Sequence, residues 1–348
     1  MSQTPKKIKV LITDDSLFMR AAIKKMLVSD GRFEVVGEAK NGREAVDKVA
    51  ALRPDVCTMD FNMPLLDGAG AVREIMKTHP TPVVMLSAHT KEGARETFEA
   101  LAAGAVDFLA KPSGEVSAEL QRIAGALVAK VAAAATAKPM AMVGAARAAA
   151  PAARLTAPRG VGLVGPKVAV VGVSTGGPSA LGRFLPRFPA DTSLALIVVQ
   201  HLPSGFTAAL AERLDGLCAI RVREAVDGDR PQAGLALVAP GDHHLELEFD
   251  GSVKITDGPE VNGVRPSVDV TMRAAAQVFG RRAVGVVMTG MGRDGADGMR
   301  AIKAAGGATL VQDEASSVIW GMPRACVEAG CADRVVALDA LADAVRSA

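Results

Sequence analysis

Residues 167–180 read KVAVVGVSTGGPSA, an apolar run that ends in a serine set between glycines. Valine-rich runs without polar alternation are typical of strands that are buried on both faces of a parallel sheet. Gly172, Ser174 and Gly176 form a G-x-S-x-G pattern where the run ends, and Gly177 and Pro178 are typical of a helix start. The stretch therefore predicts a strand, a tight turn and a helix, with the Ser174 hydroxyl presented at the end of the strand. A turn that cradles a phosphate is the alternative interpretation of this pattern.

Further buried strands are predicted on the C-terminal side of this stretch. With the first, the expected strands cover residues 167–173, 194–200, 283–289 and 309–312. A hairpin, LELEFDGSVKIT, is predicted around Asp250 and Gly251. The second half is therefore expected to be a doubly wound α/β domain with one antiparallel excursion.

The first half of the chain shows the same pattern of short apolar runs. Five short apolar runs alternate with five longer segments of helical period, and the runs cover residues 8–13, 34–39, 55–60, 82–88 and 106–110. Near-continuous apolar strands separated by helices predict a parallel sheet that is covered by helices on both faces. The chain is thus expected to hold two doubly wound parallel-sheet domains.

Residues 131–160 differ in composition from both halves. They hold 14 alanines and three prolines, and they lack acidic and aromatic residues. Because such a segment cannot anchor a core, we expect an Ala/Pro-rich linker between a domain at 1–130 and a domain at 161–348. As an alternative, the helix that precedes the linker runs on to about Lys138.

The composition excludes several classes of protein. The chain has 40 basic and 38 acidic residues, and after residue 160 it has 18 basic against 21 acidic ones, which argues against a nucleic-acid partner. The four cysteines form no C-x-x-C pair, so neither a zinc site nor a disulfide framework is expected. No apolar run is long enough for a signal peptide or a membrane span. We therefore expect a cytoplasmic protein without membrane insertion.

Polar side chains end four of the strands predicted in the first half. Asp14 and Asp15 end the first strand, Asp60 the third, Ser87 the fourth and Lys111 the fifth. Because the carboxyl ends of parallel strands meet at one edge, the three carboxylates are expected to lie close together, and Mg²⁺ prefers such oxygen ligands. A lysine and a hydroxyl beside them would complete a cradle for a phosphoryl group.

This pattern resembles the receiver domain of two-component response regulators, a flavodoxin-like fold. The resemblance implies that Asp60 accepts phosphate from a histidine kinase and that Ser87 and Lys111 contact the phosphoryl oxygens. It also implies that Phe108 is the switching aromatic residue. Mg²⁺ would be held by Asp14, Asp15, Asp60 and the backbone carbonyl of Asn62.

The Ser174 hydroxyl needs a base, and the base needs an orienting acid. His201 directly follows the predicted strand LALIVVQ, and Asp294 lies in a glycine-rich loop just beyond the strand at 283–289. Asp297 is the competing carboxylate. His243 and His244 are adjacent and would point to opposite faces of a strand, so the remaining histidines predict no metal centre.

Five segments in the second half, taken in order, resemble the CheB family of chemotaxis protein-glutamate methylesterases. They are VGVSTGGP at 171–178, QHL at 200–202, APGD at 239–242, RPSVD at 265–269 and MTGMGRDGA at 288–296. The order serine, histidine, aspartate differs from that of α/β-hydrolases. The resemblance implies a Rossmann-like serine-hydrolase domain with Ser174, His201 and Asp294 as catalytic residues.

The same resemblance implies a reaction and its partners. Chemoreceptors would be the substrates, their γ-glutamyl methyl esters would be hydrolysed without a cofactor, and some members of the family also deamidate receptor glutamines. Backbone amides near Thr175 and Met291 would bind the oxyanion. Two rival hypotheses are a receiver joined to a DNA-binding output and a scaffold whose serine site has lost its activity. The acidic second half, without a helix-turn-helix pattern, argues against the first.

Overall fold

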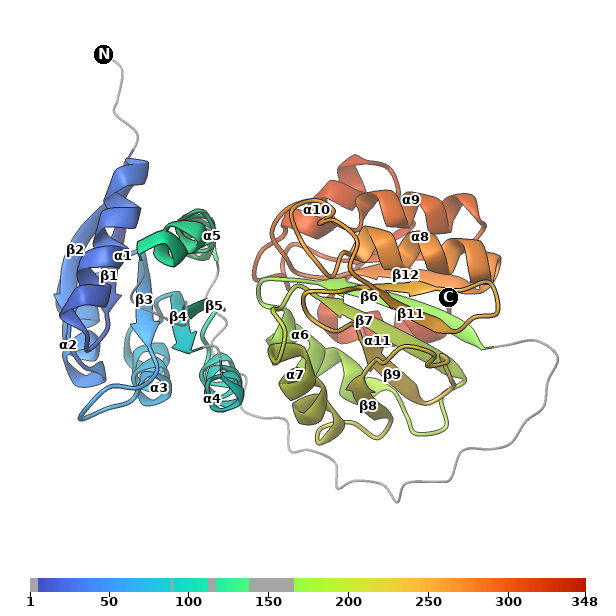
Figure 1. The fold of residues 1–348 in the computed structure, drawn as a ribbon, viewed down its shortest axis with the longest axis horizontal. Helices are drawn as coiled ribbons and strands as arrows, with labels where there is room; N and C mark the ends of the chain where they lie inside the picture. The colour runs from blue at the N-terminus through green and yellow to red at the C-terminus, as the bar shows by residue number, and fades with distance from the viewer. Residues whose placement is uncertain (1–5, 89, 112–116, 138–165) are drawn as a thin grey trace, which may run out of the picture. The chain divides into compact units, whose positions relative to one another are not determined.

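The computed structural model describes residues 6–88, 90–111, 117–137 and 166–348, and these form two compact units (Figure 1). Each unit has one parallel sheet with helices on both faces, so the expected fold class is confirmed. None of the helices in the described ranges is long and apolar enough to cross a membrane.

The first unit contains a five-stranded sheet. Its strands are β1 (Ile8–Thr13), β2 (Phe33–Ala39), β3 (Val56–Asp60), β4 (Val83–Ala88) and β5 (Asp107–Lys111). Its helices are α1 (Leu17–Asp30), α2 (Gly42–Leu52), α3 (Gly68–Thr78), α4 (Lys91–Ala102) and α5 (Ser117–Thr136). The strand order β2-β1-β3-β4-β5 is that of flavodoxin-like folds. Helices α1 and α5 cover one face, and α2, α3 and α4 cover the other.

Helix α5 continues past residue 130, where the sequence analysis placed the end of the first domain. It ends at Thr136, and Val131 and Ala134 are fully buried. Alanine is the strongest helix former, so an alanine-rich sequence prolongs a helix as long as some of its side chains still pack. The first six residues assigned to the linker thus belong to α5. Residues 138–160 of the expected linker lie outside the described residues.

The second unit contains a seven-stranded parallel sheet in the order β14-β13-β12-β6-β7-β9-β8. Its strands are β6 (Lys167–Val173), β7 (Leu194–Gln200), β8 (Arg221–Glu224), β9 (Leu235–Val238), β12 (Ala283–Val287), β13 (Ala308–Gln312) and β14 (Arg334–Val336). The expected hairpin is present as β10 (His244–Leu247) and β11 (Val253–Thr256), which pair antiparallel in a separate sheet. Strands β8, β9 and β14 were not predicted from the sequence.

Helices cover both faces of this sheet. They are α6 (Gly177–Phe184), α7 (Phe206–Asp215), α8 (Val268–Phe279), α9 (Ala296–Ala304), α10 (Gly321–Glu328) and α11 (Leu338–Arg346), with short 3-10 turns η1 (Leu185–Arg187) and η2 (Gly280–Arg282). Helices α8, α9 and α10 lie on one face, and α6, α7 and α11 lie on the other (Figure 1).

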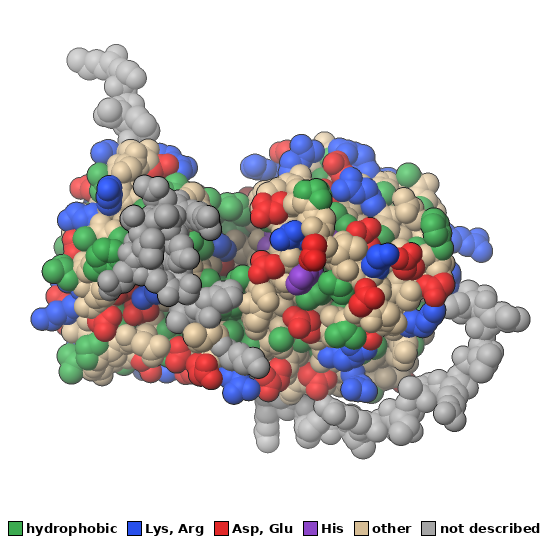
Figure 2. Space-filling view, in the orientation of Figure 1, with side chains coloured by type: hydrophobic (Ala, Val, Ile, Leu, Met, Phe, Trp, Pro, Cys, Tyr) green, Lys and Arg blue, Asp and Glu red, His purple; other side chains and the backbone are tan. Residues whose placement is uncertain are grey.

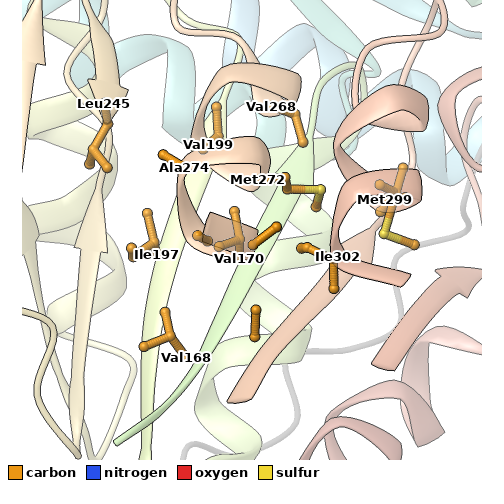
Figure 3. Close-up of a cluster of buried hydrophobic side chains, with 14 of the residues drawn as sticks. Val168, Val170, Ile197, Val199, Leu245, Val268, Met272, Ala274, Met299 and Ile302 are labelled. Carbon is orange, nitrogen blue, oxygen red and sulfur yellow. The ribbon is translucent and has the colours of Figure 1, made fainter. Parts of the chain in front are cut away.

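The core under α8 and α9 is formed by branched side chains of the central strands (Figure 3). Val170 of β6 and Ile197 of β7 are fully buried against Met272 of α8. Burying each side chain of this size stabilises the fold by about 2 kcal/mol. At Gly172 a Cβ would lie 2.4 Å from a methyl of Val268, so only glycine lets the first turn of α8 approach β6 this closely.

Strand β6 lies between β7 and β12, and the three strands are in register at their carboxyl ends. Val173 is paired with Gln200 of β7, and Gly172 is paired with Val287 of β12. The chain leaves β6 toward β7 and later returns to the other side of β6 as β12. Ligands of open α/β sheets bind at such a switch point. The residues that follow these three strands are therefore placed together.

Candidate functional sites

Ser174 lies in a turn that is held by hydrogen bonds on three sides. Its backbone N–H donates to the carbonyl of Thr289 at 3.0 Å, and its own carbonyl accepts from the N–H of Gly177 at 2.8 Å and from Nε2 of Gln200 at 3.0 Å. Gly176 has a φ of 77°, which glycine adopts without strain. The turn thus fixes the backbone of Ser174 and leaves its side chain at the end of β6.

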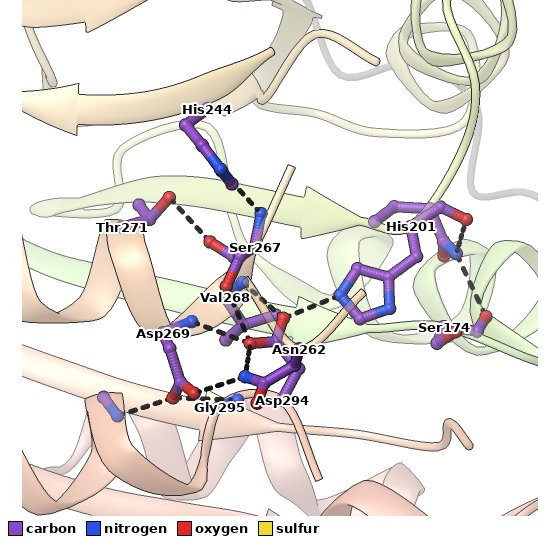
Figure 4. A network of polar contacts seen from close by, with 12 residues as sticks. Ser174, His201, His244, Asn262, Ser267, Val268, Asp269, Thr271, Asp294 and Gly295 are labelled. Carbon is purple, nitrogen blue, oxygen red and sulfur yellow. Dashed lines mark hydrogen bonds and ion pairs between the residues drawn. The ribbon is translucent and has the colours of Figure 1, made fainter. Parts of the chain in front are cut away.

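His201 lies between Asp294 and Ser174 (Figure 4). Its Nε2 is 2.8 Å from Oδ2 of Asp294, and its backbone N–H donates to the carbonyl of Val173, the residue before Ser174. Within the described residues the Ser174 hydroxyl forms no hydrogen bond. Hydrogen bonds between a nucleophile and its base often tighten only when substrate binds.

Asp294 is almost fully buried and accepts five hydrogen bonds. Besides His201, its donors are the Nδ2 of Asn262, the hydroxyl of Ser267 and the backbone N–H groups of Val268 and Asp269. Burial alone would raise the pKa of this carboxyl, but the hydrogen bond and charge of His201, together with Ser267 and Val268, lower the pKa of Asp294 to about 2. Asp294 is therefore an anion that can only accept hydrogen bonds.

A second buried carboxylate lies behind Asp294. Asp269 accepts from the N–H groups of Gly295 and Gly298, and Asn262 donates to both aspartates (Figure 4). Burial, together with the negative charge of Asp294, raises the pKa of Asp269. No role was predicted from the sequence for Asn262, Ser267 or Asp269. Ser267 and Asp269 belong to the segment RPSVD, which offered a signal, whereas Asn262 lies outside every segment that was singled out.

The other acidic and histidine candidates of the second half have different partners. Asp297, the competing carboxylate, forms an ion pair with Arg300 on the surface and does not contact His201. His243 is paired with Asp257, whereas His244 is buried and bonds to the N–H of Ser267 and the carbonyl of Pro259.

Both residues expected near the oxyanion lie beside the Ser174 turn. The carbonyl of Thr175 accepts from the hydroxyl of Thr289. Met291 is exposed in the loop after β12, and this loop also holds Gly290, where a Cβ would lie 2.8 Å from Cβ of Ser174.

In the first unit the expected acidic residues come together at one edge of the sheet. One carboxylate oxygen from each of Asp14, Asp15 and Asp60 lies within 4.8 Å of the others, the only such group of potential metal ligands in the ranges that the structure describes. Nζ of Lys111 is 2.8 Å from Asp14 and 2.7 Å from Asp60. Three carboxylates facing one ammonium leave an excess of negative charge. The donor set therefore fits a hard divalent cation.

Burial, partly offset by the charge and hydrogen bond of Lys111, raises the pKa of Asp60 to about 6. Burial alone would lower the pKa of Lys111, but Asp60 and Asp14 raise it above its ordinary value. Ser87 is buried, and its hydroxyl donates to the carbonyl of Gly93. The side chain of Asn62 is exposed and donates to Glu96. Phe108, the expected switching residue, is buried.

The two units together are typical of one class of protein. The first unit carries an acidic site like that of receiver domains, and the second is an α/β unit with a serine, a histidine and an aspartate at the switch point of its sheet. Comparison with known families agrees with this division. The family model described as "Response regulator receiver domain" matches residues 10–122, and that described as "CheB methylesterase" matches residues 169–345. The chain belongs to the CheB methylesterase family and carries a receiver domain, as its sequence indicated.

Relatives of this chain match over nearly its whole length. A protein-glutamate methylesterase/protein-glutamine glutaminase of Symbiobacterium thermophilum is 47% identical, covering 98% of this chain and 97% of the relative. One of Pyrococcus abyssi is 44% identical over 99% of this chain and 94% of the relative. The crystal structure of the Thermotoga maritima CheB methylesterase catalytic domain is 37% identical and has a TM-score of 0.52, covering 53% of this chain and 99% of that one.

Proposed function

We propose that this protein hydrolyses γ-glutamyl methyl esters on chemoreceptors and that phosphorylation of Asp60 activates the reaction. The observation that carries the proposal is the contact between His201 and Asp294 beside Ser174, at the ends of three adjacent strands. This trio lies in a chain that belongs to the CheB methylesterase family. The substrates would be cytoplasmic segments of the receptors.

In the proposed mechanism the Ser174 hydroxyl attacks the ester carbonyl. Because Asp294 is an anion bound to Nε2 of His201, Nε2 carries the proton and Nδ1 is the free base. Nδ1 takes the serine proton and returns it to the methoxide that leaves, so that methanol and an acyl-enzyme form. The same nitrogen then activates water, which releases the glutamate and regenerates Ser174.

The tetrahedral intermediate carries a negative oxygen that needs donors. We assign this role to backbone amides near Thr175 and Met291, on the two loops that flank Ser174. Removing one such donor typically costs about 3 kcal/mol of transition-state stabilisation. The buried donors of Ser267, Val268 and Asp269 hold the orientation of the Asp294 carboxylate.

Asp60 is proposed as the phosphate acceptor from a histidine kinase. Asp14, Asp15, Asp60 and the Asn62 carbonyl would hold Mg²⁺, whose positive charge would offset the negative charge of the phosphoryl oxygens. Lys111 already contacts Asp60 and would pair with the new charge, and the Ser87 hydroxyl would turn from Gly93 to the phosphoryl group.

Deamidation of receptor glutamines is a second candidate reaction. The relatives of this chain are named for both activities. An amide carbonyl can be attacked by the same serine, and ammonia would then leave in place of methanol.

Methanol release from a methylated receptor fragment tests the proposed function. We expect turnover by the wild type, an increase on adding a phosphodonor with Mg²⁺, and loss of nearly all turnover in Ser174→Ala. Ser204→Ala, which changes an exposed serine in the loop after His201, serves as the matched control. Turnover that survives in Ser174→Ala would overturn the assignment of the nucleophile.

A further inference from the structure

An open pocket of about 440 Å³ lies on the face of the second unit formed by α9, α10 and the loop after β12. Its lining includes three arginines, Arg293, Arg300 and Arg324, and one acidic residue, Glu328. Figure 2 shows Lys and Arg side chains gathered over the part of this unit where Figure 1 places α9 and α10.

The positive charge of this arginine pocket is only partly neutralised. Arg324 is 3.5 Å from Glu328, and both side chains are more than half exposed, so the pair is weak. Arg300 is paired with Asp297, again at the surface. The exposed guanidinium of Arg293 forms no ion pair or hydrogen bond with any residue that the structure describes. The pocket therefore retains an arginine that can bind an anion with two parallel hydrogen bonds.

The arginine pocket adjoins the proposed catalytic residues. Arg293 directly precedes Asp294 in the chain. Gly321 at the start of α10 lines the pocket, and a Cβ there would lie 2.8 Å from the carbonyl of Gly290. Gly290 in turn packs against Ser174. A polypeptide whose ester side chain reaches Ser174 would thus pass beside the pocket.

We propose that the arginine pocket binds a carboxylate side chain of the substrate polypeptide, located about one helical turn from the ester that is hydrolysed. This inference rests on the proposed function, because it concerns the recognition of the same substrate. The methyl ester itself is uncharged, so it cannot form a charge-assisted bidentate pair with an arginine of the pocket. A glutamate three or four residues away lies on the same helix face, about 4.5–6 Å along the axis, and its carboxylate can pair with a guanidinium.

Two synthetic helical peptides test the proposal on the full-length protein. Each carries one γ-glutamyl methyl ester, with either glutamates or alanines three and four residues away on both sides; glutamines are avoided because they could themselves be deamidated. We expect the wild type to show a KM about tenfold lower for the glutamate peptide, equivalent to about 1.4 kcal/mol. The preference should fall at 0.5 M salt, because screening weakens exposed charge pairs.

Variants assign the preference to the pocket. In Arg293→Gln the KM ratio between the two peptides should fall to about threefold, and in Arg293→Gln/Arg324→Gln it should fall to about one. Arg281→Gln is the matched control, because Arg281 is an exposed arginine at the opposite, amino end of β12, and it should keep the tenfold ratio. A wild-type ratio near one, or an unchanged ratio in the double variant, would overturn the proposal.

Binding distinguishes a failure of this proposal from a failure of the proposed function. The unesterified glutamate peptide, labelled with a fluorophore, is titrated with the wild type and the double variant, and fluorescence anisotropy gives both Kd values without any turnover. We expect Kd to rise about tenfold in the double variant. If the wild type releases no methanol, the proposed function fails, but this comparison still decides whether the pocket binds carboxylates. Equal Kd values for the wild type and the double variant would refute the claim that the pocket binds carboxylates.

Discussion

At the scale of single residues, the proposed ester hydrolysis depends on how firmly the carboxyl group of Asp294 is kept ionised. Five donors bind its two oxygens. Burial would raise its pKa, but the hydrogen bonds from His201, Ser267 and Val268 lower the pKa to about 2. A carboxylate that can only accept fixes the tautomer of His201 and leaves one ring nitrogen free. The proposed nucleophile therefore meets a base that is already oriented.

Asp294→Asn should reverse which ring nitrogen of His201 carries the proton. An asparagine amide can donate toward Nε2 of His201, which would place the proton on Nδ1, the nitrogen that must accept from Ser174. We expect kcat for methyl ester hydrolysis to fall by about 10³- to 10⁴-fold, as for the equivalent change in serine proteases. Steady-state methanol release checks this, with Asp297→Asn as the control. A loss of less than tenfold in Asp294→Asn would contradict the assigned role.

The raised pKa of Asp60 predicts a dependence of stability on pH. Its pKa of about 6 in the folded state exceeds the ordinary value of 3.8. The contribution of this carboxyl group to stability is therefore fully present below pH 3.8 and is lost as the pH rises through 6. The difference of about two pH units corresponds to about 3 kcal/mol. Asp60→Asn, which cannot ionise, should therefore stabilise the receiver unit at pH 7.5 by about 1–3 kcal/mol in the absence of Mg²⁺.

Thermal unfolding in EDTA at pH 7.5 and pH 4 measures this effect. The stabilisation should be large at pH 7.5, nearly absent at pH 4 and reduced by Mg²⁺, which binds the ionised carboxylate. A variant that is less stable than the wild type at pH 7.5 in EDTA would show that Lys111 fully compensates the buried charge.

The candidate residues could be proposed from the sequence because each follows a buried strand. Ser174, His201 and Asp294 come after β6, β7 and β12, and parallel strands bring such positions to one edge. Asn262 could not be proposed in this way. It lies in a loop with a φ of 57°, and its contacts with Asp269 and Asp294 depend on the folded path of that loop.

At the scale of elements, the strands that could be predicted from the sequence are those whose residues are most completely buried. Every residue of β7 and all but the first of β6 are buried, and the runs predicted for these strands match them residue for residue. Strand β14 has three residues, of which two are exposed, and β8 also has an exposed residue. Strands β8 and β9 have only four residues each. Such short strands, at or next to an edge of the sheet, leave little signal in the hydrophobic pattern.

Two glycines of α6 should respond in opposite ways when each is replaced by alanine, because their surroundings differ. At Gly177 a Cβ would lie 2.0 Å from Oε1 of Gln200 and 2.7 Å from a methyl of Val173, so Gly177→Ala should destabilise the second unit by about 1–3 kcal/mol. At Gly182 the nearest atom is 4.0 Å away, on Leu217. Gly182→Ala should therefore stabilise the unit by about 0.5–1 kcal/mol.

Urea unfolding of both variants measures the two effects. Gly177→Ala should also lower kcat, because the displaced Gln200 side chain holds the carbonyl of Ser174. Equal midpoints for the two variants would contradict the packing described for this turn.

At the scale of the whole molecule, each unit has its own sheet and core. The catalytic half covers 99% of a domain that was crystallised by itself, so residues 161–348 are expected to fold alone. Because both domains belong to one chain, each has a high effective concentration for the other, so a weak contact would be enough to restrain activity. The sequence resemblances predicted a receiver and a methylesterase domain, and both family models match. No pattern within either domain predicts a contact between them.

The isolated fragment 161–348 should therefore hydrolyse receptor methyl esters faster than the unphosphorylated full-length protein. Phosphodonor should raise the activity of the full-length chain toward that of the fragment and leave the fragment unchanged. Initial rates of methanol release at equal concentrations make the comparison. A fragment no faster than the unphosphorylated full-length protein would argue against restraint by the receiver.

Covalent labelling by a serine-directed phosphonate tests the central claim most directly, because it reports which hydroxyl is activated. Peptide mapping of the full-length protein by mass spectrometry should find one label per chain, on the peptide that contains Ser174, and labelling should be abolished in His201→Gln. Labelling of another serine, or equal labelling of wild type and His201→Gln, would contradict the claim that Ser174, His201 and Asp294 act together.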